Sequence, residues 1–500
     1  MKTRNHIFMS AAVAISLAAT SAQALKTEEL TLKGNRQVEY TKLPGAVDSF
    51  GAMFTEGMLY GRLRSNNFYW DAANDKANST DDHLLSGVGA SLVYKSGEFY
   101  GVSATLGAYG SVVVSDDNIF PGTTTNYGKT GKDMFRLLPD GSEQPMGVLA
   151  QAYLEYRIGK TDVKAGRQLI ESALIASNDT KMIPNAFEAV VAENRDLPDT
   201  KVRLGYLVRQ KLRNHQTFHS ILAYQSRLEN DDAAVHKGLS VDNIRAMGGD
   251  TDADMVLLTV ENASVPNLKL KGDYYHLDGF FGTLVAEANY KIPVGAGWSL
   301  TPGVRYLRQM DDGAGRIGGA AVGGAFAVNQ TPDAADLASY SNPYSVDASM
   351  WAGRLVLANG PFSLMGGYSS VADDADLIAP WRGFPTAGYT RSMGQYNWTA
   401  GTDSWMLQAK YDFGKAGLLP GFFAAIDFAD MDYDDRKIQA GTISYTDRHT
   451  VHFDLTQTFD ALPDTELKFR CAVITADKKP ADTLDYQSYS EYRLELNYFF

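Results

Sequence analysis

Apolar and polar residues alternate along most of this chain, from about residue 54 to the C-terminal residue. The last segment shows the pattern most clearly, because Tyr492, Leu494, Leu496, Tyr498 and Phe500 share one face of an extended chain and polar residues occupy the other. The i, i+3, i+4 spacing of an amphipathic helix is almost absent. A period of two predicts strands that have one apolar face and one polar face.

The alternating segments are about as long as a tilted strand that crosses a bilayer, roughly 9 to 11 residues. They cover residues 84–94, 100–110, 148–158, 201–211, 268–277, 284–292, 300–307, 405–413, 451–458 and 467–475. On residues 148–158, Leu154, Tyr156 and Ile158 would face lipid, and Gln151 and Glu155 would face inward. A polar inner face predicts a wet interior.

Short and long connections alternate between these segments. Tight turns such as 95–97, 159–160 and 294–297 are interleaved with long polar stretches over residues 111–145, 214–250, 310–342 and 371–401. Outer-membrane barrels have this asymmetry. We therefore predict an all-β fold, a transmembrane antiparallel β-barrel of about 18 strands over residues 53–500. A soluble β-sandwich or β-solenoid is the alternative, but neither needs an aromatic C-terminal strand.

The N-terminus predicts export. Lys2 and Arg4 precede an apolar stretch over residues 7–19, and small residues follow at 21–24. This arrangement is typical of a secretory signal peptide, here residues 1–24, and leaves residues 25–52 as an N-terminal segment before the barrel. The sole cysteine, Cys471, cannot form an internal disulfide and shares its face with apolar residues.

Composition excludes two other classes of protein. With 46 Lys and Arg against 59 Asp and Glu, the formal net charge is -13, which disfavours a nucleic-acid partner. Beyond the N-terminus no apolar run reaches the roughly 18 uncharged residues of a membrane-spanning helix. The 27 Tyr, 23 Phe and 46 Gly instead favour short strands joined by tight turns.

Two motifs resemble metal sites only in spacing. Asp250, Asp252, Asp254 and Glu261 match an EF-hand loop, but Met255 stands where that loop requires glycine. His215 and His219 are four residues apart, a spacing that separates the rings by roughly 13 Å in an extended chain. The sequence predicts no metal site and no cofactor.

Cations at strand positions form the candidate functional set, because most lie on the face opposite the apolar one. We expect them to line the pore as a cationic track that lowers the energy of an anionic solute at a narrow point. The alternative is scattered interior charge balanced by Glu155, Asp273 and Asp412. Arg167 and Arg308 share faces with apolar residues and are left out. The predicted track consists of Arg62, Arg64, Lys164, Arg203, Arg209, Lys410, Lys468 and Arg470.

Three segments resemble the OprD-like family of substrate-specific outer-membrane porins. These are Leu63–Tyr69 (LRSNNFY), Gly166–Gln168 (GRQ) and Asn178–Glu188 (NDTKMIPNAFE). The resemblance implies an 18-stranded pore narrowed by an inward-folded third loop and a ladder of basic residues that carries carboxylate groups. The implied constriction-loop residues are Asn178, Asp179, Lys181, Pro184, Phe187 and Glu188. The chain departs from the family pattern at Lys181, where the family has arginine, and at Ala189, where it has glycine.

The predicted function is therefore an outer-membrane porin, not an enzyme, that passes small hydrophilic, carboxylate-bearing solutes by passive diffusion. Outer-membrane lipid and the barrel-assembly machinery, which would recognise the C-terminal strand ending at Phe500, are the other expected partners, and a homotrimer is an open possibility. One rival is a barrel hydrolase using His449, His452 and Asp454. Another is a non-conducting structural or adhesin barrel, which predicts a plugged lumen.

Overall fold

The computed structural model describes residues 30–33, 36–40, 42–75, 79–115, 124–125, 133–137, 143–224, 236–379 and 388–500. The expected signal peptide, residues 1–24, lies outside them. Among the described residues, no helix is long and apolar enough to cross a membrane.

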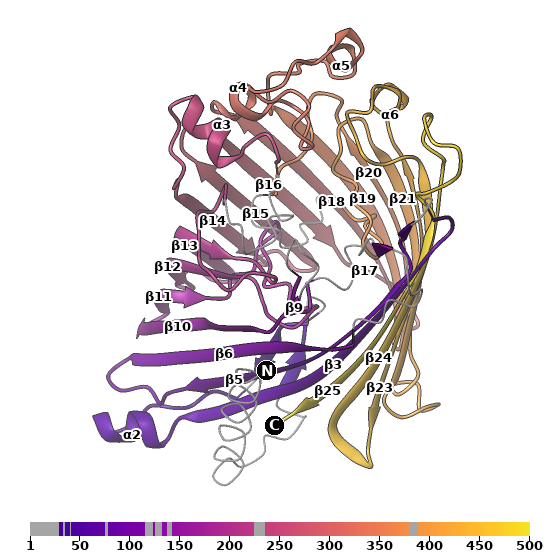
Figure 1. Cartoon of the computed structure of the whole chain (residues 1–500). Coiled ribbons are helices and arrows are strands. Elements are labelled where there is room, and N and C mark those ends of the chain that lie inside the picture. Colours follow the sequence, from indigo (N-terminus) through magenta and orange to yellow (C-terminus); the bar gives the residue numbers. More distant parts are fainter. Residues whose placement is uncertain are drawn as a thin grey trace.

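A single closed antiparallel barrel makes up most of the molecule (Figure 1). Strand β17 continues β16 along the edge of β18, so the barrel has 18 strands, as predicted. The last strand pairs with the first barrel strand and closes the sheet. The barrel strands are β3 (Met58–Ala72), β5 (His83–Lys95), β6 (Val102–Ser115), β10 (Met146–Ile158), β11 (Thr161–Gln168), β12 (Ala186–Asn194), β13 (Thr200–Lys211), β14 (Met255–Asn262), β15 (Leu268–Leu277), β16 (Phe281–Tyr290), β17 (Ile292–Gly295), β18 (Trp298–Asp311), β19 (Ala348–Asn359), β20 (Phe362–Val371), β21 (Asp403–Asp412), β22 (Phe422–Asp432), β23 (Arg448–Phe459), β24 (Leu462–Ala476) and β25 (Tyr489–Phe499).

Short elements lie outside the barrel sheet. Three small sheets pair β1 (Leu30–Leu32) with β2 (Val38–Tyr40), β4 (Ser79–Thr80) with β7 (Thr124–Thr125), and β8 (Arg136–Leu137) with β9 (Glu143–Gln144). The helices within the described residues are α2 (Phe50–Thr55), α3 (Val241–Ala246), α4 (Ala314–Gly318), α5 (Ala334–Ala338) and α6 (Asp435–Ala440).

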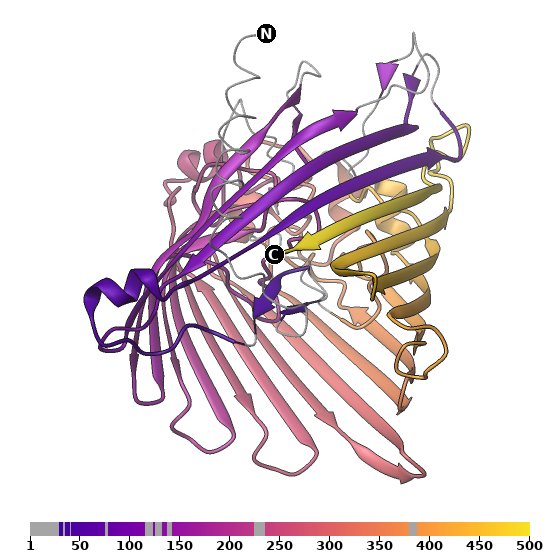
Figure 2. The ribbon, with the colours of Figure 1, turned by 90° about the horizontal axis from the view of Figure 1, so that it is seen from below.

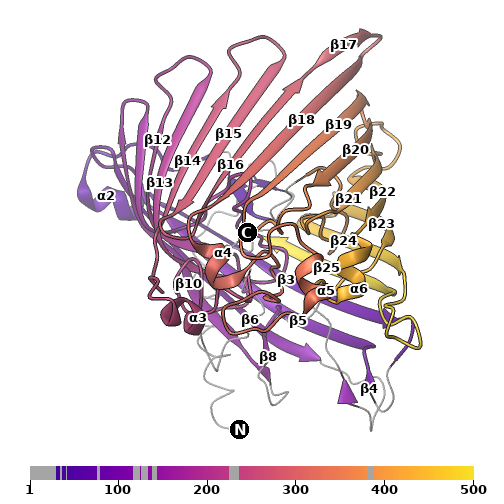
Figure 3. The ribbon, with the colours of Figure 1, turned by 90° about the horizontal axis from the view of Figure 1, so that it is seen from above.

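The two ends of the barrel differ as the connection lengths predict. Tight turns join β10 to β11, β12 to β13 and β14 to β15 at one end, which we call the short-turn end (Figures 2 and 3). The connections that carry α3, α4, α5 and α6 lie at the opposite, long-loop end (Figure 1).

The wall has an apolar outer face and a polar inner face. Alternate residues such as Leu204, Tyr206, Leu494 and Leu496 are exposed on the outside, while the residues between them are mostly buried or half-buried. Aromatic rings gather on the outer face near both ends of the strands, as in the interfacial girdles of membrane barrels. The contacting pairs are Tyr69–Tyr492, Trp351–Tyr368 and Trp405–Phe428 near the long loops, and Trp298–Phe362, Phe413–Phe422 and Tyr498–Phe500 near the short turns.

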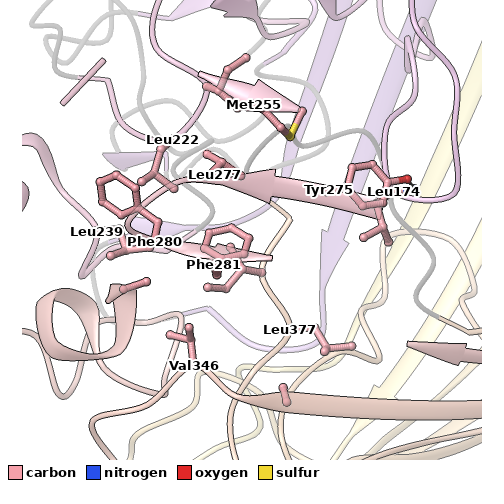
Figure 4. Close-up of a cluster of buried hydrophobic side chains, with 14 of the residues drawn as sticks. Leu174, Leu222, Leu239, Met255, Tyr275, Leu277, Phe280, Phe281, Val346 and Leu377 are labelled. Carbon is pink, nitrogen blue, oxygen red and sulfur yellow. Dashed lines mark hydrogen bonds between the residues drawn. The ribbon is translucent and has the colours of Figure 1, made fainter. Parts of the chain in front are cut away.

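A hydrophobic cluster inside the barrel packs the long loops against the wall (Figure 4). It combines inward residues of β14, β15 and β16, such as Leu277 and Phe281, with Leu239 and Val346 from the long loops. Part of the lumen is therefore filled by folded loops, whose apolar side chains are sheltered from the wet interior.

Candidate functional site

Strand pairing fixes which predicted cations face the lumen, because directly paired residues point to the same side of a sheet. Arg62 pairs with Phe499, and Lys164 pairs with Glu155, all opposite to the exposed apolar rows. By the same reasoning, the structure places these members of the predicted track on the inner face: Arg62, Arg64, Lys164, Arg203, Lys410, Lys468 and Arg470.

Arg209 differs from the prediction, because it lies on the outer face. Glu188 pairs with Arg209, whereas Ala189 pairs with Leu207, so Val208 is an extra residue in β13. A bulge of this kind shifts the alternation by one residue. Arg209 is consequently half-exposed and 3.8 Å from Asp252.

Glu188 also lies on the outer face, in β12 rather than in a loop. Its carboxylate accepts a hydrogen bond of 2.9 Å from Arg167, which the alternation had already placed outside. Phe187, the preceding residue, is fully buried on the inner face of the same strand. The predicted constriction loop therefore ends before these two residues.

The connection between β11 and β12, residues 169–185, folds into the barrel; we call it the constriction loop. On one side it reaches β3, where Asp179 pairs with both Arg62 and Arg64, and Arg64 Nη1 lies 2.8 Å from Asp179 Oδ1. On the other side it reaches β15, where the backbone N–H of Ala173 donates to Asp273 Oδ2 over 2.6 Å. Because seven strands lie between β3 and β15 in the barrel order, the loop crosses the lumen.

Glycines on the wall make room for this loop. Gly87 and Gly89 on β5 face the lumen, and Met182 packs against them. A Cβ atom at Gly89 would lie 2.8 Å from the Met182 sulfur, so a larger residue there would require the Met182 side chain to shift.

Lys181 is the most unusual residue of the constriction loop. Its side chain is buried, and Nζ lies 3.8 Å from the centroid of the Phe68 ring. Among the residues that the structure describes, Lys181 Nζ has no hydrogen-bond or ion-pair partner. Burial, with the charges of Arg493 and Arg213 nearby, holds the pKa of Lys181 well below its usual value.

Two arginines from different elements act electrostatically on this lysine. Arg493 on β25 lies 5.1 Å from the same Phe68 ring, and the charges of Arg213 and Arg493 act on both Lys181 and Arg391. Burial first, and these charges next, lower the pKa of Arg391 to about 10. We call this group the central cation cluster; its members are Lys181, Arg213, Arg391 and Arg493.

Two carboxylates partly balance the cluster. Asp133 Oδ2 lies 2.6 Å from Arg213, and Glu491 pairs with Arg493. Within the part of the chain that the structure describes, these two ion pairs bring carboxylates to Arg213 and Arg493, whereas Lys181 Nζ has no such partner. Desolvated charges of one sign strongly favour a counter-ion.

The wall around this cluster is a lattice of both signs rather than a row of free cations. Arg203 donates to Glu193 over 2.7 Å, Lys468 lies 2.7 Å from Asp454, and Arg470 pairs with Glu495. These pairs agree with the alternative in that carboxylates balance strand cations, although the carboxylates are Glu193, Asp454 and Glu495 rather than the ones expected. In the central cation cluster, by contrast, Lys181, Arg213 and Arg391 lie in loops and Arg493 lies on β25.

Further lumen cations were missed by sequence reasoning. Arg305 and Arg354 lie 5.1 and 4.4 Å from the ring of Tyr389 in the connection between β20 and β21. Strand alternation places Arg305, Arg354 and Arg493 on the inner face, so all three could have been predicted from the sequence. Arg391 and Arg213 lie in loops, where parity carries no information.

The N-terminal segment also enters the lumen. The Arg36 guanidinium is buried against Glu466 and Glu495, inward residues of β24 and β25. Its backbone carbonyl accepts a hydrogen bond of 3.0 Å from Arg62, and Tyr40 contacts the ring of Tyr60 at 3.9 Å. Residues 36–40 thus reduce the open cross-section beside the constriction loop.

The structure places the residues of the two metal-like motifs differently: it separates the EF-hand-like carboxylates and brings the two histidines together. Glu261 pairs with Lys201 on the inner face, whereas Asp252 and Asp254 contact Arg209 and Tyr206, so the EF-hand spacing brings no ligands together. The predicted separation of His215 and His219 is wrong, because the chain turns between them and the ring nitrogens lie 2.8 Å apart. Burial, together with His215, lowers the pKa of His219 to about 3.

The side chains considered for a hydrolase do not form a nucleophile–base pair. His452 Nδ1 lies 2.9 Å from Asp427, and Ser392 donates to the other oxygen of the same carboxylate over 2.6 Å. A catalytic triad requires the imidazole between the hydroxyl and the carboxylate. His449 lies on the outer face, next to Phe428.

A family model described as "outer membrane porin, OprD family" matches residues 125–500. No curated protein matches the sequence. Among solved structures, the chain is similar to Pseudomonas aeruginosa OccK9 (OpdG), with 17% identity, a TM-score of 0.68 and coverage of 90% of this chain and 99% of that one. Pseudomonas aeruginosa OpdK with vanillate gives 15% identity, a TM-score of 0.65 and the same coverage. Acinetobacter baumannii OccAB3 gives 14% identity, a TM-score of 0.67 and coverage of 89% and 99%.

Proposed function

This chain belongs to the OprD family of outer membrane porins, and we propose that its lumen favours small hydrophilic solutes that carry a carboxylate group. The barrel lies in the outer membrane and acts as a channel. A concentration gradient drives passive diffusion, so the process needs no cofactor. In this proposal residues 1–24 are a signal peptide and residues 53–500 form the barrel.

The observation that carries this proposal is the buried, unpartnered amine of Lys181 in the loop that crosses the lumen, whose pKa is lowered by burial and by neighbouring cations. A charge removed from water and left without a carboxylate is unfavourable by several kcal/mol. A solute carboxylate that enters the central cation cluster would supply the missing counter-charge. The cations of the cluster also offset the desolvation penalty of that carboxylate. This lowers the energy barrier for an anion relative to a neutral solute.

Loop and wall have different roles in this proposal. The wall lattice of alternating sign lets a solute exchange one partner for the next without a deep energy minimum. The central cation cluster sets the sign of the preferred solute. The relative OpdK was solved with vanillate, a carboxylate, which supports the same solute class for this channel.

Liposome swelling tests the proposal. Vesicles containing the folded protein are placed in iso-osmotic sodium gluconate or glucose, which are similar in size and differ in charge, with a salt-matched reference. Gluconate is expected to enter faster than glucose, and Lys181→Met is expected to remove the difference. Equal rates through the unmodified channel would remove the carboxylate preference while leaving the porin function intact.

A further inference from the structure

We propose that an exposed aromatic patch at the short-turn end inserts into the phospholipid leaflet that faces the periplasm, and so anchors the N-terminal segment to the membrane. The patch consists of Phe50 and Phe54 on α2 and Phe99 and Tyr100 in the turn between β5 and β6. It lies outside the residues that the family model matches. It is also independent of which solute the lumen prefers.

The four rings form one continuous surface. Phe50 contacts Phe54 and Phe99 with ring centroids 5.2 and 6.3 Å apart, and Phe99 contacts Tyr100 at 4.6 Å. Tyr100 is 86% exposed, Phe50 64% and Phe54 51%. Contiguous exposed aromatic surface is uncommon on a protein face that meets only water.

The patch lies on the outer side of the wall. Tyr94 on β5 is an outward residue, because it pairs with the exposed Leu106 of β6. The Tyr94 hydroxyl donates to the carbonyl of Phe54 over 2.7 Å, which places the end of α2 over the lipid-facing side of β5. Figures 1 and 2 show α2 outside the barrel beside the same ends of β5 and β6.

Backbone hydrogen bonds hold the patch in place. The backbone N–H of Gly97 donates to the carbonyl of Met53 over 2.8 Å, and that of Val47 donates to the carbonyl of Glu98 over 2.8 Å. Ser49 caps the helix by accepting a hydrogen bond from the backbone N–H of Ala52. Met53 is buried under the helix, whereas Phe50 and Phe54, which are four residues apart and therefore share a helix face, are exposed.

The turn carries a residue that backbone geometry does not favour. Tyr100 and Gly101 have φ of 48° and 82°, so both are in the left-handed region. Hairpin turns of this kind prefer asparagine, aspartate or glycine at the first position. A tyrosine there gains little from the fold itself, but its ring is well suited to the membrane interface, where an apolar body and a polar hydroxyl meet lipid and water.

The aromatic patch continues the lipid-facing surface of the wall, and this continuity identifies phospholipid as its partner. The patch extends the outer surface formed by Tyr94 and Leu106 beyond the end of the strands. Residues 50–55 of α2 carry no charged side chain, so insertion at the interface desolvates no ion within the helix. Phospholipid is therefore the partner that this surface fits, rather than a periplasmic protein.

The consequence concerns the segment that enters the pore. Residues 36–40 dock in the lumen, and α2 follows only ten residues later on the outside of the wall. An anchored α2 fixes one end of the connection between them. The membrane would thereby help to keep Arg36 against Glu466 and Glu495.

Spin-label accessibility tests the proposal on the full-length barrel in phosphatidylethanolamine–phosphatidylglycerol vesicles. In a Cys471→Ser background, a nitroxide is attached at Phe50→Cys, and in a second variant at Tyr100→Cys. The matched control is Lys160→Cys in the neighbouring turn between β10 and β11, where the side chain is exposed and polar. Collision rates with oxygen, which concentrates in lipid, and with a water-soluble nickel complex are then compared.

The oxygen-to-nickel collision ratio is expected to be several-fold higher at residues 50 and 100 than at residue 160. A ratio at residue 50 equal to that at residue 160 would place the patch in water and overturn membrane insertion, leaving a periplasmic protein as its partner. Heat-modifiable migration on gels and channel conductance establish that each labelled barrel is folded. Phe54→Cys replaces either variant if it does not fold.

Discussion

Asp179 on the constriction loop accepts a hydrogen bond of 2.8 Å from Arg64 on β3, and the same carboxylate also pairs with Arg62. These two arginines are members of the predicted cationic track. A residue of the protein's own loop occupies both. The contact holds the loop across the lumen and neutralises part of the wall, so it couples pore width to pore charge.

Asp179→Asn is expected to widen the channel and increase its anion preference. Removing one member of a buried ion pair typically costs about 3 to 5 kcal/mol, which would release this end of the loop and expose two guanidiniums. Single-channel recordings in planar bilayers should show a higher, noisier conductance and a reversal potential shifted toward anions. Asp252→Asn on the outside is the control, and identical behaviour of the two variants would contradict the role assigned to Asp179.

Arg203→Glu and Arg209→Glu should differ, although the residues share strand parity. Arg203 faces the lumen beside Glu193, so charge reversal there is expected to reduce anion preference in a salt gradient. Arg209 faces outward beyond the bulge at Val208, and its reversal should leave the selectivity unchanged. An equal effect of both changes would show that β13 lacks the bulge in the functional channel.

Arg36→Ala is expected to raise the single-channel conductance. The change removes the buried guanidinium that holds residues 36–40 against Glu466 and Glu495, and so frees lumen cross-section. Lys33→Ala, which removes the more exposed pair between Lys33 and Glu39, is the matched control. Conductance unchanged by Arg36→Ala would mean that this segment does not limit the current.

Acidification should loosen the long-loop end. The backbone N–H of Gly238 donates to His236 Nδ1, and His236 Nε2 lies 2.8 Å from the Gly319 carbonyl, an arrangement that requires a neutral ring. Burial lowers the pKa of His236 to about 4. The unfolded chain, with a histidine pKa of about 6.5, binds the proton more readily, so this contribution of about 3 kcal/mol is present above pH 6.5 and is lost as the pH falls to about 4.

The measurement is channel noise at pH 7 and at pH 4.5. The unmodified protein should be noisier at the lower pH, and His236→Gln, which can keep both hydrogen bonds without titrating, should reduce that difference. His449→Gln on the outer face should behave like the unmodified protein. A pH effect that persists in full in His236→Gln would assign it to other groups.

Much of the site could be derived from alternation, and its failures have local causes. Parity placed Arg62, Lys164 and Arg470 on the inner face and excluded Arg167, because side-chain direction in a regular strand depends only on residue number. Parity gave the wrong face for Arg209, because the extra residue Val208 shifts the alternation of inward and outward side chains by one position. The distance between His215 and His219 was misjudged because an extended chain was assumed where the backbone turns.

The sequence by itself determined the barrel: strand length, alternation and the asymmetry of connections are local properties that neighbouring residues impose on one another. Tertiary structure alone decided the chemistry of the lumen. Asp179 meets Arg62 across 117 residues of chain, and Arg36 meets Glu466 across 430. Such pairs arise when loops fold into a closed wall, and no local pattern records which lumen charge will be neutralised and which, like Lys181, will be left for a solute.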